Sequence, residues 1–317
     1  MNFKITGTGS YLPERVVTND DLAGMVETSD EWIRQRVGIH ERRVATSETT
    51  VDMAVNAAKS ALDAAGVDPS ELDLILTSTV SGEMVSPSTA CMVQKRLGAT
   101  CMAYEINAAC SAFIFLLETA AGYFARGKAK KALLIGTEKL SRILNWQDRS
   151  TCVIFGDGAG AVVVEAGENY LDSTFDVQGD DEVIRIPHWH GESPFDTTEP
   201  EEPFIHMAGQ ETFKFAVSSI TRDVKLLLER NSLTADDIKY IVPHQANARI
   251  IDTAARRLKI PQEKFYLNID RLGNTSSASI PIALDELARS GKLERGDKII
   301  FCAFGGGLSA AAALMNW

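Results

Sequence analysis

Two stretches of the chain, ALDAAGVDPSELDLILTSTV at residues 61–80 and LLERNSLTADDIKYIVPHQA at residues 227–246, align without a gap at a spacing of 166 residues. In each stretch, a segment with helical periodicity runs into an Asp-containing turn and then into a short apolar run. Each stretch therefore predicts a helix, a turn and a strand in that order, and the repeat indicates an internal duplication.

The correspondence extends beyond both stretches. Gly127 and Gly291 end helical segments 164 residues apart, and the same spacing places Cys110 opposite Asn274. Further on, IFGDGAGAVVV from Ile154 aligns with AFGGGLSAAAA at a spacing of 149, whereas the preceding predicted strands align at 167. The first half therefore holds about eighteen extra residues before Ile154, which form a candidate substrate or subunit loop.

The alternation of helical and apolar segments predicts an α/β protein. Residues 1–166 would form the N-terminal half and residues 167–317 the C-terminal half, and no linker rich in Pro, Gly or Ser separates them. We therefore expect one compact body with a shared core. The predicted helices cover residues 20–38, 50–65, 89–97, 111–125, 212–230, 247–258 and 278–290, and the predicted strands cover residues 2–9, 72–80, 101–107, 131–137, 238–242, 265–269 and 297–303.

The composition is that of a globular protein and excludes several classes of function. Of the 317 residues, 45% are hydrophobic, and the formal net charge is -11 at pH 7. An acidic chain is a poor general nucleic-acid binder, because that role needs basic surface that displaces counterions from phosphates. The N-terminus lacks a basic region followed by an apolar core, and no stretch makes a good membrane span, so we expect a cytoplasmic protein without a membrane partner.

The cysteines and histidines give no metal-binding pattern. The five cysteines form no CxxC pair and no Cys/His zinc spacing, and their odd number argues against a disulfide framework. His188 and His190 flank Trp189 in the irregular stretch 181–207 and would point the same way on a strand, as metal ligands can, but no third ligand is evident. We expect no metal site.

Cys110 is the first candidate for chemistry. It lies where INAACSAFIFLL passes from a strand into a helix with a broad apolar face. Backbone N–H groups and the dipole at a helix N-terminus stabilise an anion, which predicts a lowered thiol pKa and a nucleophile. The alternative is a small buried residue in an alanine-rich helix.

Two polar residues of the second half could act with this cysteine. His244, which the duplication matches to Ser78, follows a strand in VPHQAN and is either an acid/base or oxyanion-donor histidine or a structural one. Asn274 in RLGNTSSAS is either a donor or a turn or cap residue. Strand ends from both halves should converge on one pocket, where a thiolate, an imidazole and a carboxamide suit thioester chemistry. The turn Gly305–Gly307 would let backbone N–H groups approach an oxyanion closely, or is simply a tight structural turn.

Together with the motifs around them, these residues resemble a known family, the β-ketoacyl-acyl carrier protein synthase III enzymes of the thiolase superfamily. The resemblance covers nearly the whole chain and is carried in order by GTGSYLPE, TSDEWI, VGIHERR, PSTAC, NAACSAF, FGDGAGA, MAGQETFK, VPHQAN, DRLGNTSSAS and AFGGG. It implies a duplicated, five-layered αβαβα thiolase-like fold, a homodimer, and no cofactor besides the coenzyme A thioester that serves as substrate.

The resemblance also implies a reaction and a catalytic triad of Cys110, His244 and Asn274. In such enzymes the cysteine takes an acyl group from acyl-CoA. Malonyl-acyl carrier protein then binds and loses carbon dioxide, while the histidine and asparagine hold its thioester oxygen. The carbanion attacks the acyl-cysteine and gives 3-ketoacyl-acyl carrier protein, which starts fatty-acid synthesis. The N–H groups of Cys110 and Gly306 would form the oxyanion hole of the acylation step.

The binding residues are carried over in the same way. Trp32 and Arg149 would hold the adenine of coenzyme A between them, because an aromatic ring and an arginine suit a purine. The other implied coenzyme A contacts are Arg36, Gly209 and Asn247. The carrier-protein docking patch would comprise Lys214, Arg249, Arg256 and Arg257, with a solvated charged face as the alternative. The acyl pocket is expected at Ser86, Leu140, Phe155 and Phe304.

Three departures from the family pattern bear on the substrate. Ser86 stands before Pro87 where the family often has a bulkier residue, Ala112 replaces a frequent glycine, and residues 308–310 read Leu-Ser-Ala instead of an aromatic-Thr-Trp type sequence. A longer or branched primer, or a condensing enzyme of a specialised pathway, is therefore the alternative function. A catalytically silent scaffold that binds carrier protein is a third hypothesis, which the intact triad opposes.

Overall fold

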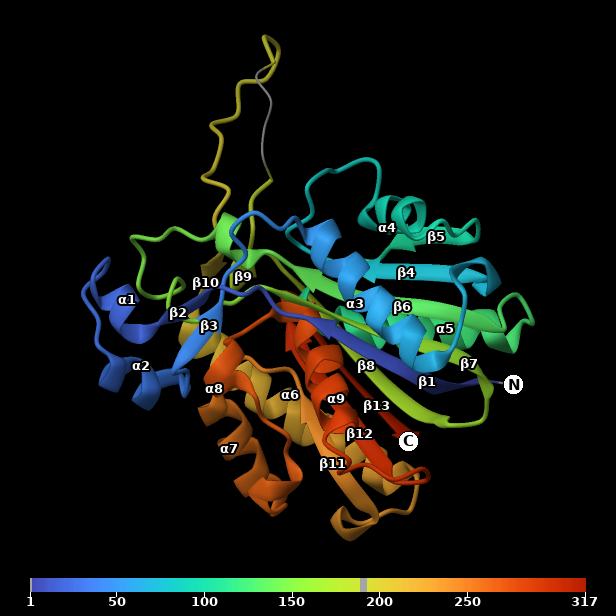
Figure 1. The fold of residues 1–317 in the computed structure, drawn as a ribbon. Helices are drawn as coiled ribbons and strands as arrows, with labels where there is room; N and C mark the ends of the chain where they lie inside the picture. Colours follow the sequence, from blue (N-terminus) through green and yellow to red (C-terminus); the bar gives the residue numbers. More distant parts are fainter. Residues whose placement is uncertain (1, 189–192) are drawn as a thin grey trace.

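The computed structural model describes residues 2–188 and 193–317, and two β-sheets organise them (Figure 1). The strands of the first sheet, in spatial order, are β1 (Asn2–Tyr11), β7 (Gly158–Gly167), β6 (Lys131–Glu138), β4 (Leu74–Ser78) and β5 (Met102–Glu105). Those of the second are β8 (Tyr170–Asp180), β13 (Gly307–Asn316), β12 (Lys298–Gly305) and β11 (Ile238–Pro243). In both sheets the first three strands pair antiparallel and the next pair is parallel, so the second sheet repeats the first, with a single parallel bridge from Phe265 to Ile241 at the position of β5.

Helices cover both sheets and fill the space between them. The six long helices are α3 (Thr50–Ala65), α4 (Thr89–Leu97), α5 (Ala112–Ala125), α6 (Gly209–Arg230), α7 (Ala248–Leu258) and α9 (Ser279–Arg289). Because side chains alternate along a strand, β6 turns Leu133 and Ile135 towards the α3 and α4 layer and Ala132 and Leu134 towards α5. The second sheet packs against α6 and α7 on its outer face. The layers therefore run helix, sheet, helix, sheet, helix, which is the expected αβαβα thiolase-like fold.

The central layer belongs to both halves. One apolar cluster contains Phe3 and Leu76 of the first sheet, Phe113 of α5, and Val242 and Phe301 of the second sheet, all buried. The predicted boundary between residues 166 and 167 falls at the end of β7. Neither half encloses this cluster alone.

Two sequence expectations about elements were wrong. The single helix expected over residues 20–38 is two helices, α1 (Asn19–Ala23) and α2 (Asp30–Val37), because Ser29 caps a new helix by accepting a hydrogen bond from the backbone N–H of Trp32. The strand expected over residues 265–269 is one isolated bridge between Phe265 and Ile241, and the short helix α8 (Ile269–Leu272) follows it.

The pairing of Cys110 with Asn274 also needs correction. The helices α5 and α9 begin 167 residues apart, at Ala112 and Ser279, but α5 has 14 residues and α9 has 11. The spacing of 164 therefore describes the helix ends, whereas the turns before the helices match at 167. Cys110 corresponds to Ser277, and Asn274 corresponds to Asn107.

Several of the remaining short elements lie at one end of the layers. They include β2 (Val16–Thr18) with β3 (Glu41–Arg43), β9 (Ile184–Arg185) with β10 (His206–Met207), and the 3₁₀ turns η2 (Ala109–Ser111), η3 (Leu140–Ile143) and η6 (Ser276–Ala278). The described residues that follow β9 extend away from the layered body (Figure 1).

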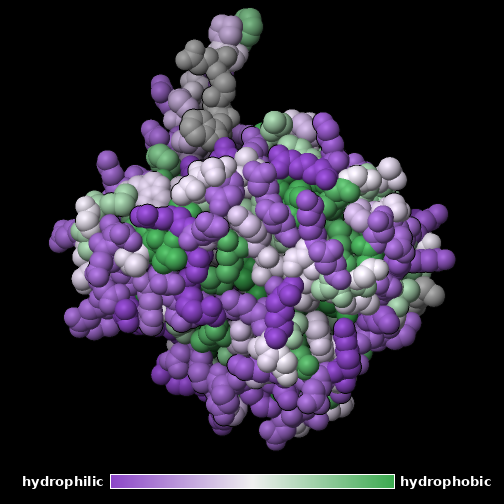
Figure 2. Space-filling model, viewed as in Figure 1, coloured by the Kyte–Doolittle hydropathy of each residue, from purple (hydrophilic) through white to green (hydrophobic). Residues whose placement is uncertain are grey.

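Hydrophilic side chains cover most of the face shown in Figure 2, and apolar surface shows mainly in hollows between them. Among the described residues, no helix combines the length and the apolar character that a bilayer crossing requires.

Candidate active site

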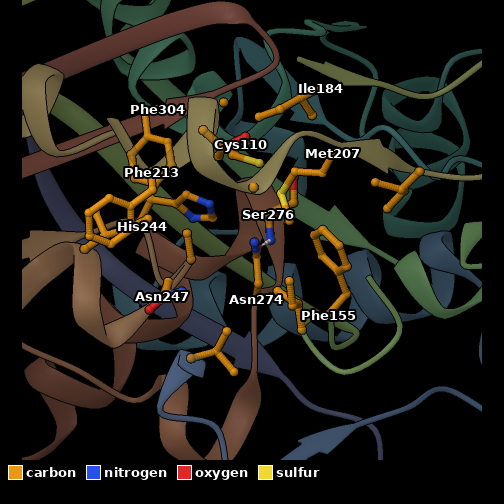
Figure 3. Close-up of a pocket in the computed structure, with 18 of the residues that line it drawn as sticks. Cys110, Phe155, Ile184, Met207, Phe213, His244, Asn247, Asn274, Ser276 and Phe304 are labelled. Atoms are coloured by element: carbon orange, nitrogen blue, oxygen red, sulfur yellow. Dashed lines mark hydrogen bonds between the residues drawn. The ribbon is translucent and has the colours of Figure 1, made fainter. Parts of the chain in front are cut away.

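A cavity of about 540 Å³ opens where the two halves meet, and Cys110, His244 and Asn274 all line it (Figure 3). Cys110 comes from η2 before α5, His244 from the end of β11, and Asn274 from the segment between α8 and η6. Strand ends and helix starts from both halves thus converge on one site, as expected from the sequence.

Cys110 sits in a tight turn that the second half holds in place. The preceding Ala109 has a left-handed backbone with φ of 46°. The hydroxyls of Ser111 and Ser309 are 2.6 Å apart, and Ser309 also donates to the carbonyl of Gly306 at 2.9 Å. Gly305 packs so closely that a Cβ at this position would lie 2.8 Å from the backbone nitrogen of Cys110. The glycine turn therefore lies directly beside the nucleophile.

The thiol of Cys110 does not have the lowered pKa that its place before a helix suggested. Burial of the sulfur raises its pKa to about 12, because protein atoms replace the water that would solvate a thiolate. This loss of solvation outweighs the hydrogen bonds with the Ser276 side chain and with the backbone, both of which lower the pKa. With this pKa, the residue is a protonated thiol at neutral pH.

His244 is a buried, neutral imidazole. Its side chain is 1% exposed, and its backbone N–H donates to the carbonyl of Cys302 at 2.8 Å, which fixes it at the end of β11. Burial lowers its pKa to about 3. The ring Nδ1 lies 2.7 Å from the hydroxyl of Ser279, and the ring meets Phe304 edge to face with centroids 5.4 Å apart. Ser279 and Phe304 thus hold the ring on two sides, and its remaining side faces the cavity (Figure 3).

Asn274 is locked at both its backbone and its side chain. Its backbone N–H donates to Ile154, and its carbonyl accepts from Gly156. Its Oδ1 accepts from the backbone N–H of Ser276 at 2.8 Å (Figure 3). The carboxamide oxygen is thus used within the turn, which leaves the Nδ2 amino group as the donor for a ligand in the cavity.

Most of the predicted coenzyme A contacts gather at one side of this cavity. Trp32, Arg36, Gly209 and Asn247 line it, and the side chain of Asn247 caps α7 by accepting from the N–H of Arg249. The guanidinium of Arg149 does not line the cavity but lies 5.3 Å from the centre of the Trp32 ring. An adenine between these two groups would require Arg149 to move outwards.

The four basic residues predicted to dock a carrier protein divide into two groups. Lys214 on α6 and Arg249 on α7 lie at the cavity and are exposed. Arg256 and Arg257 lie further along α7, outside the cavity, and Arg256 forms an ion pair with Asp252 at 2.8 Å. The helices that carry these residues, α6 and α7, pack against each other.

The residues expected in the acyl pocket also divide. Leu140, Phe155 and Phe304 are buried and line the cavity; Leu140 lies within the extra residues of the first half, and Phe155 follows them. Ser86 is exposed and does not line the cavity of this chain. Gly306 is likewise not among the lining residues, although its neighbour Gly305 is.

Two features of the site escaped the sequence reasoning. The stretch 181–207, to which no role was assigned, supplies four apolar cavity residues: Ile184, Ile186, Ile205 and Met207. The other feature is Glu138 at the end of β6, which is fully buried and whose pKa is raised by that burial. Its carboxyl group accepts from the N–H of Val80 at 3.0 Å and from the hydroxyl of Ser277 at 2.9 Å. It thereby links Val80, which lines the cavity, to η6 of the second half.

The histidine pair of the stretch 181–207 lies partly beyond what the structure describes. His188 is described, whereas Trp189 and His190 lie outside the described residues. Among the described residues, no group of three or more His, Cys, Asp or Glu side chains is placed to hold a metal ion.

Comparisons with known proteins agree with this geometry. Residues 104–179 match the family model for 3-oxoacyl-[acyl-carrier-protein] synthase III, and residues 228–317 match the model for its C-terminal part. A β-ketoacyl-[acyl-carrier-protein] synthase III of Clostridium beijerinckii is 47% identical, over 100% of this chain and 99% of the relative.

Solved structures give the same result. The crystal structure of 3-oxoacyl-[acyl-carrier-protein] synthase III from Aquifex aeolicus superposes with a TM-score of 0.93 at 46% identity and covers 99% of this chain and 100% of that one. A priming β-ketosynthase of a polyketide biosynthetic pathway superposes with a TM-score of 0.91 at 33% identity and covers 99% and 96% of the two chains. The chain therefore belongs to the β-ketoacyl-acyl carrier protein synthase III family of acyl-transferring condensing enzymes.

Proposed function

We propose that this chain condenses the acyl group of an acyl-CoA with malonyl-acyl carrier protein and so starts fatty-acid synthesis, with Cys110 as the nucleophile. The observation that carries the proposal is the convergence of Cys110, His244 and Asn274 on one cavity. A sulfur nucleophile and two neutral donors are what a two-stage thioester reaction needs.

In the first stage, the sulfur of Cys110 attacks the thioester carbon. The bond to the sulfur of coenzyme A breaks, and the proton of the cysteine thiol leaves with the coenzyme A thiol. We assign the N–H groups of Cys110 and Gly306 to the developing oxyanion. The close packing of Gly305 on Cys110 supports this role, because it brings the backbone of the glycine turn to the nucleophile.

In the second stage, the malonyl thioester loses carbon dioxide. The electron pair of the broken C–C bond becomes an enolate, whose oxygen we assign to the Nδ2 group of Asn274 and the imidazole of His244. The enolate carbon attacks the acyl-cysteine, the C–S bond to Cys110 breaks, and the cysteine sulfur takes up a proton from solvent. Donors in a buried site stabilise such an anion more strongly than water does, because they are already oriented.

Trp32, Arg36, Arg149, Gly209 and Asn247 would bind coenzyme A in this scheme. Lys214, Arg249, Arg256 and Arg257 would receive the acidic carrier protein, and the exposure of all four basic side chains supports that assignment. Arg149 would open from Trp32 to admit the adenine.

Incubation with radiolabelled acyl-CoA tests the covalent stage. Label should appear on Cys110 in the wild-type protein and be absent from folded Cys110→Ala. His244→Ala should lose malonyl decarboxylation more than self-acylation, and equal loss of both would contradict the division of roles.

The apolar cavity favours a primer longer than acetyl, which is the second candidate for the substrate. Ile184, Ile186, Ile205 and Met207 extend the apolar lining, and the resemblance to a polyketide priming enzyme makes a specialised pathway the alternative setting. Turnover of thioesters from acetyl-CoA to dodecanoyl-CoA decides this point. Fastest turnover with acetyl-CoA would exclude the longer primer.

We also propose that the protein is cytoplasmic and forms a homodimer. Met84, Val85 and Met102 are large apolar side chains that are at least half exposed, and Met102 belongs to β5, the end strand of the first sheet. Apolar surface at an open sheet edge supports pairing of two copies there. Sedimentation as a monomer at micromolar concentration would refute the dimer.

A further inference from the structure

We infer that Ser279 is a positioning residue for His244, and that it holds the neutral imidazole in the tautomer with its proton on Nε2. The inference rests on the proposed function, because it gives His244 the form that can donate a hydrogen bond to the malonyl thioester oxygen.

The hydrogen bonds of Ser279 decide the direction of its contact with the ring. Ser279 is the first residue of α9 and is 2% exposed. Its Oγ accepts from the backbone N–H of Gln245 at 3.3 Å and lies 2.7 Å from Nδ1 of His244. Among the described residues, Nδ1 is the one acceptor recorded for this hydroxyl. A buried hydroxyl hydrogen without an acceptor is costly, so Ser279 donates to Nδ1.

The tautomer follows from that direction. A neutral imidazole carries one proton, and a nitrogen that accepts a hydrogen bond does not carry it. Nε2 therefore bears the hydrogen. Burial keeps the ring neutral. Among the described residues, the ring has no carboxylate partner whose charge would compensate the loss of water.

The assigned tautomer has two consequences, one for the decarboxylation stage and one for the acylation stage. Nε2–H of His244 and Nδ2–H of Asn274 are both donors, and both residues border the space below Cys110 in Figure 3. Together they provide two hydrogen bonds for an enolate oxygen. Conversely, an Nε2 that already carries a proton cannot take one from the thiol of Cys110, so His244 in this form is not the base of the acylation stage.

Within the part of the chain that the structure describes, no other contact of the ring would fix the tautomer as Ser279 does. The contact with Phe304 constrains the plane of the ring but does not distinguish its two nitrogens. The bond from Gln245 holds Ser279 itself, and the Nε2 group of Gln245 donates in turn to the carbonyls of Pro243 and Tyr266 at 2.8 and 3.1 Å. A chain of buried hydrogen bonds thus runs from β11 through Gln245 and Ser279 to the imidazole.

The first test is spectroscopic and needs no substrate. In the wild-type enzyme labelled with ¹⁵N-histidine, with the His244 signals assigned by comparison with His244→Gln, long-range ¹H–¹⁵N correlation should show protonated Nε2 and unprotonated Nδ1. Protonated Nδ1 would overturn the inference. Ser279→Ala should show both tautomers, because neither nitrogen then has a preferred partner.

The second test is kinetic. Ser279→Ala should lower the malonyl decarboxylation rate by about 10- to 100-fold and change self-acylation by less than about twofold. Ser279→Thr keeps the hydroxyl and should recover most of the rate. Ser290→Ala removes a serine hydroxyl at the opposite end of α9, where it donates to the carbonyl of Leu287, and controls for damage to the helix.

The outcomes distinguish failure of the Ser279 inference from failure of the proposed function. Equal loss of both stages in Ser279→Ala, or failure of Ser279→Thr to recover the rate, would make Ser279 merely structural and overturn the inference. Absence of decarboxylation in the wild type would sink the proposed function, while the spectrum would still report the tautomer. If Ser279→Ala does not fold, the wild-type spectrum and the threonine variant decide alone.

Discussion

The turns that begin α5 and α9 share a backbone design and differ in the side chain that each presents to the cavity. In the first, Oδ1 of Asn107 accepts from the N–H of Ala109 at 3.2 Å, and in the second, Oδ1 of Asn274 accepts from the N–H of Ser276 at 2.8 Å. Ala109 and Ser276 have φ of 46° and 47°. The same local hydrogen bond therefore stabilises the same left-handed residue in both halves.

The difference lies in which position of the turn does the chemistry. In the first half, the fourth residue, Cys110, lines the cavity and Asn107 is exposed. In the second half, the first residue, Asn274, lines the cavity, and the fourth, Ser277, is turned away to donate to Glu138. A duplicated scaffold thus places two turns at one cavity, and each half uses a different position of its turn.

Exchange of the fourth residues should have the largest effect. Cys110→Ser gives the first turn the residue of the second and should lower acyl transfer by about a thousandfold or more, because a serine hydroxyl without a base is a poor nucleophile. The rate of label transfer from acyl-CoA measures this change. Ser277→Cys is the matched variant. It should take up no label, since residue 277 is 1% exposed and does not line the cavity. Label on that cysteine would show that the two positions are interchangeable.

The first residues of the turns provide the next comparison. Asn274→Ala removes a cavity donor and should lower decarboxylation by about 100-fold, as loss of one oxyanion donor does elsewhere. Asn107→Ala removes only the turn hydrogen bond and should cost about 1 kcal/mol of unfolding free energy, measured in urea. Decarboxylation assays on both variants compare them directly. Similar losses of activity would mean that Asn274 acts only through the turn.

The matched strands β4 and β11 lead to different residues: β4 ends at Ser78, whereas His244 follows β11. Because an imidazole can be protonated, the stability of the fold should depend on pH through His244. Burial lowers the pKa of His244 from 6.5 to about 3, so the unfolded chain takes up a proton below pH 6.5 that the folded chain refuses. The contribution of the neutral imidazole to the free energy of unfolding is therefore complete above pH 6.5 and is lost as the pH falls towards 3.

Comparison with His244→Gln isolates this contribution. The wild type should lose up to about 1.4 kcal/mol per pH unit relative to the variant between pH 6 and 4. Urea unfolding at several pH values measures the difference. Parallel curves for the two proteins would show that the imidazole is solvated in the native state.

These turns also show how far the sequence alone could reach. Helical and strand periodicity correctly located α3, α4 and the strands of the three parallel pairs, and motif order indicated Cys110, His244 and Asn274 before any geometry was known. The correspondence between the turns was misassigned because the spacing of helix ends does not reveal that α5 is longer than α9.

Other properties depend on contacts between distant segments. The pKa of Cys110 was predicted in the wrong direction because a helix N-terminus is local, whereas burial depends on segments such as Gly305 that are far away in sequence. Ile184 and Met207 lie in strands of two residues each, too short for a periodic pattern. Glu138 resembles an ordinary polar residue at a strand end, and its partners come from both halves.

The smallest expected effect concerns the left-handed residues themselves. Ala109→Gly and Ser276→Gly each relieve the cost of a positive φ but give the unfolded chain more freedom, and these effects oppose each other at about 1 kcal/mol each. Unfolding free energies in urea should therefore change by less than about 1 kcal/mol, and by similar amounts in the two variants, because the two φ angles agree within a degree. Ala278→Gly, in the same turn as Ser276 but without a positive φ, is the control and should be destabilising. Opposite signs at positions 109 and 276 would mean that the shared backbone geometry is maintained by different forces in the two halves.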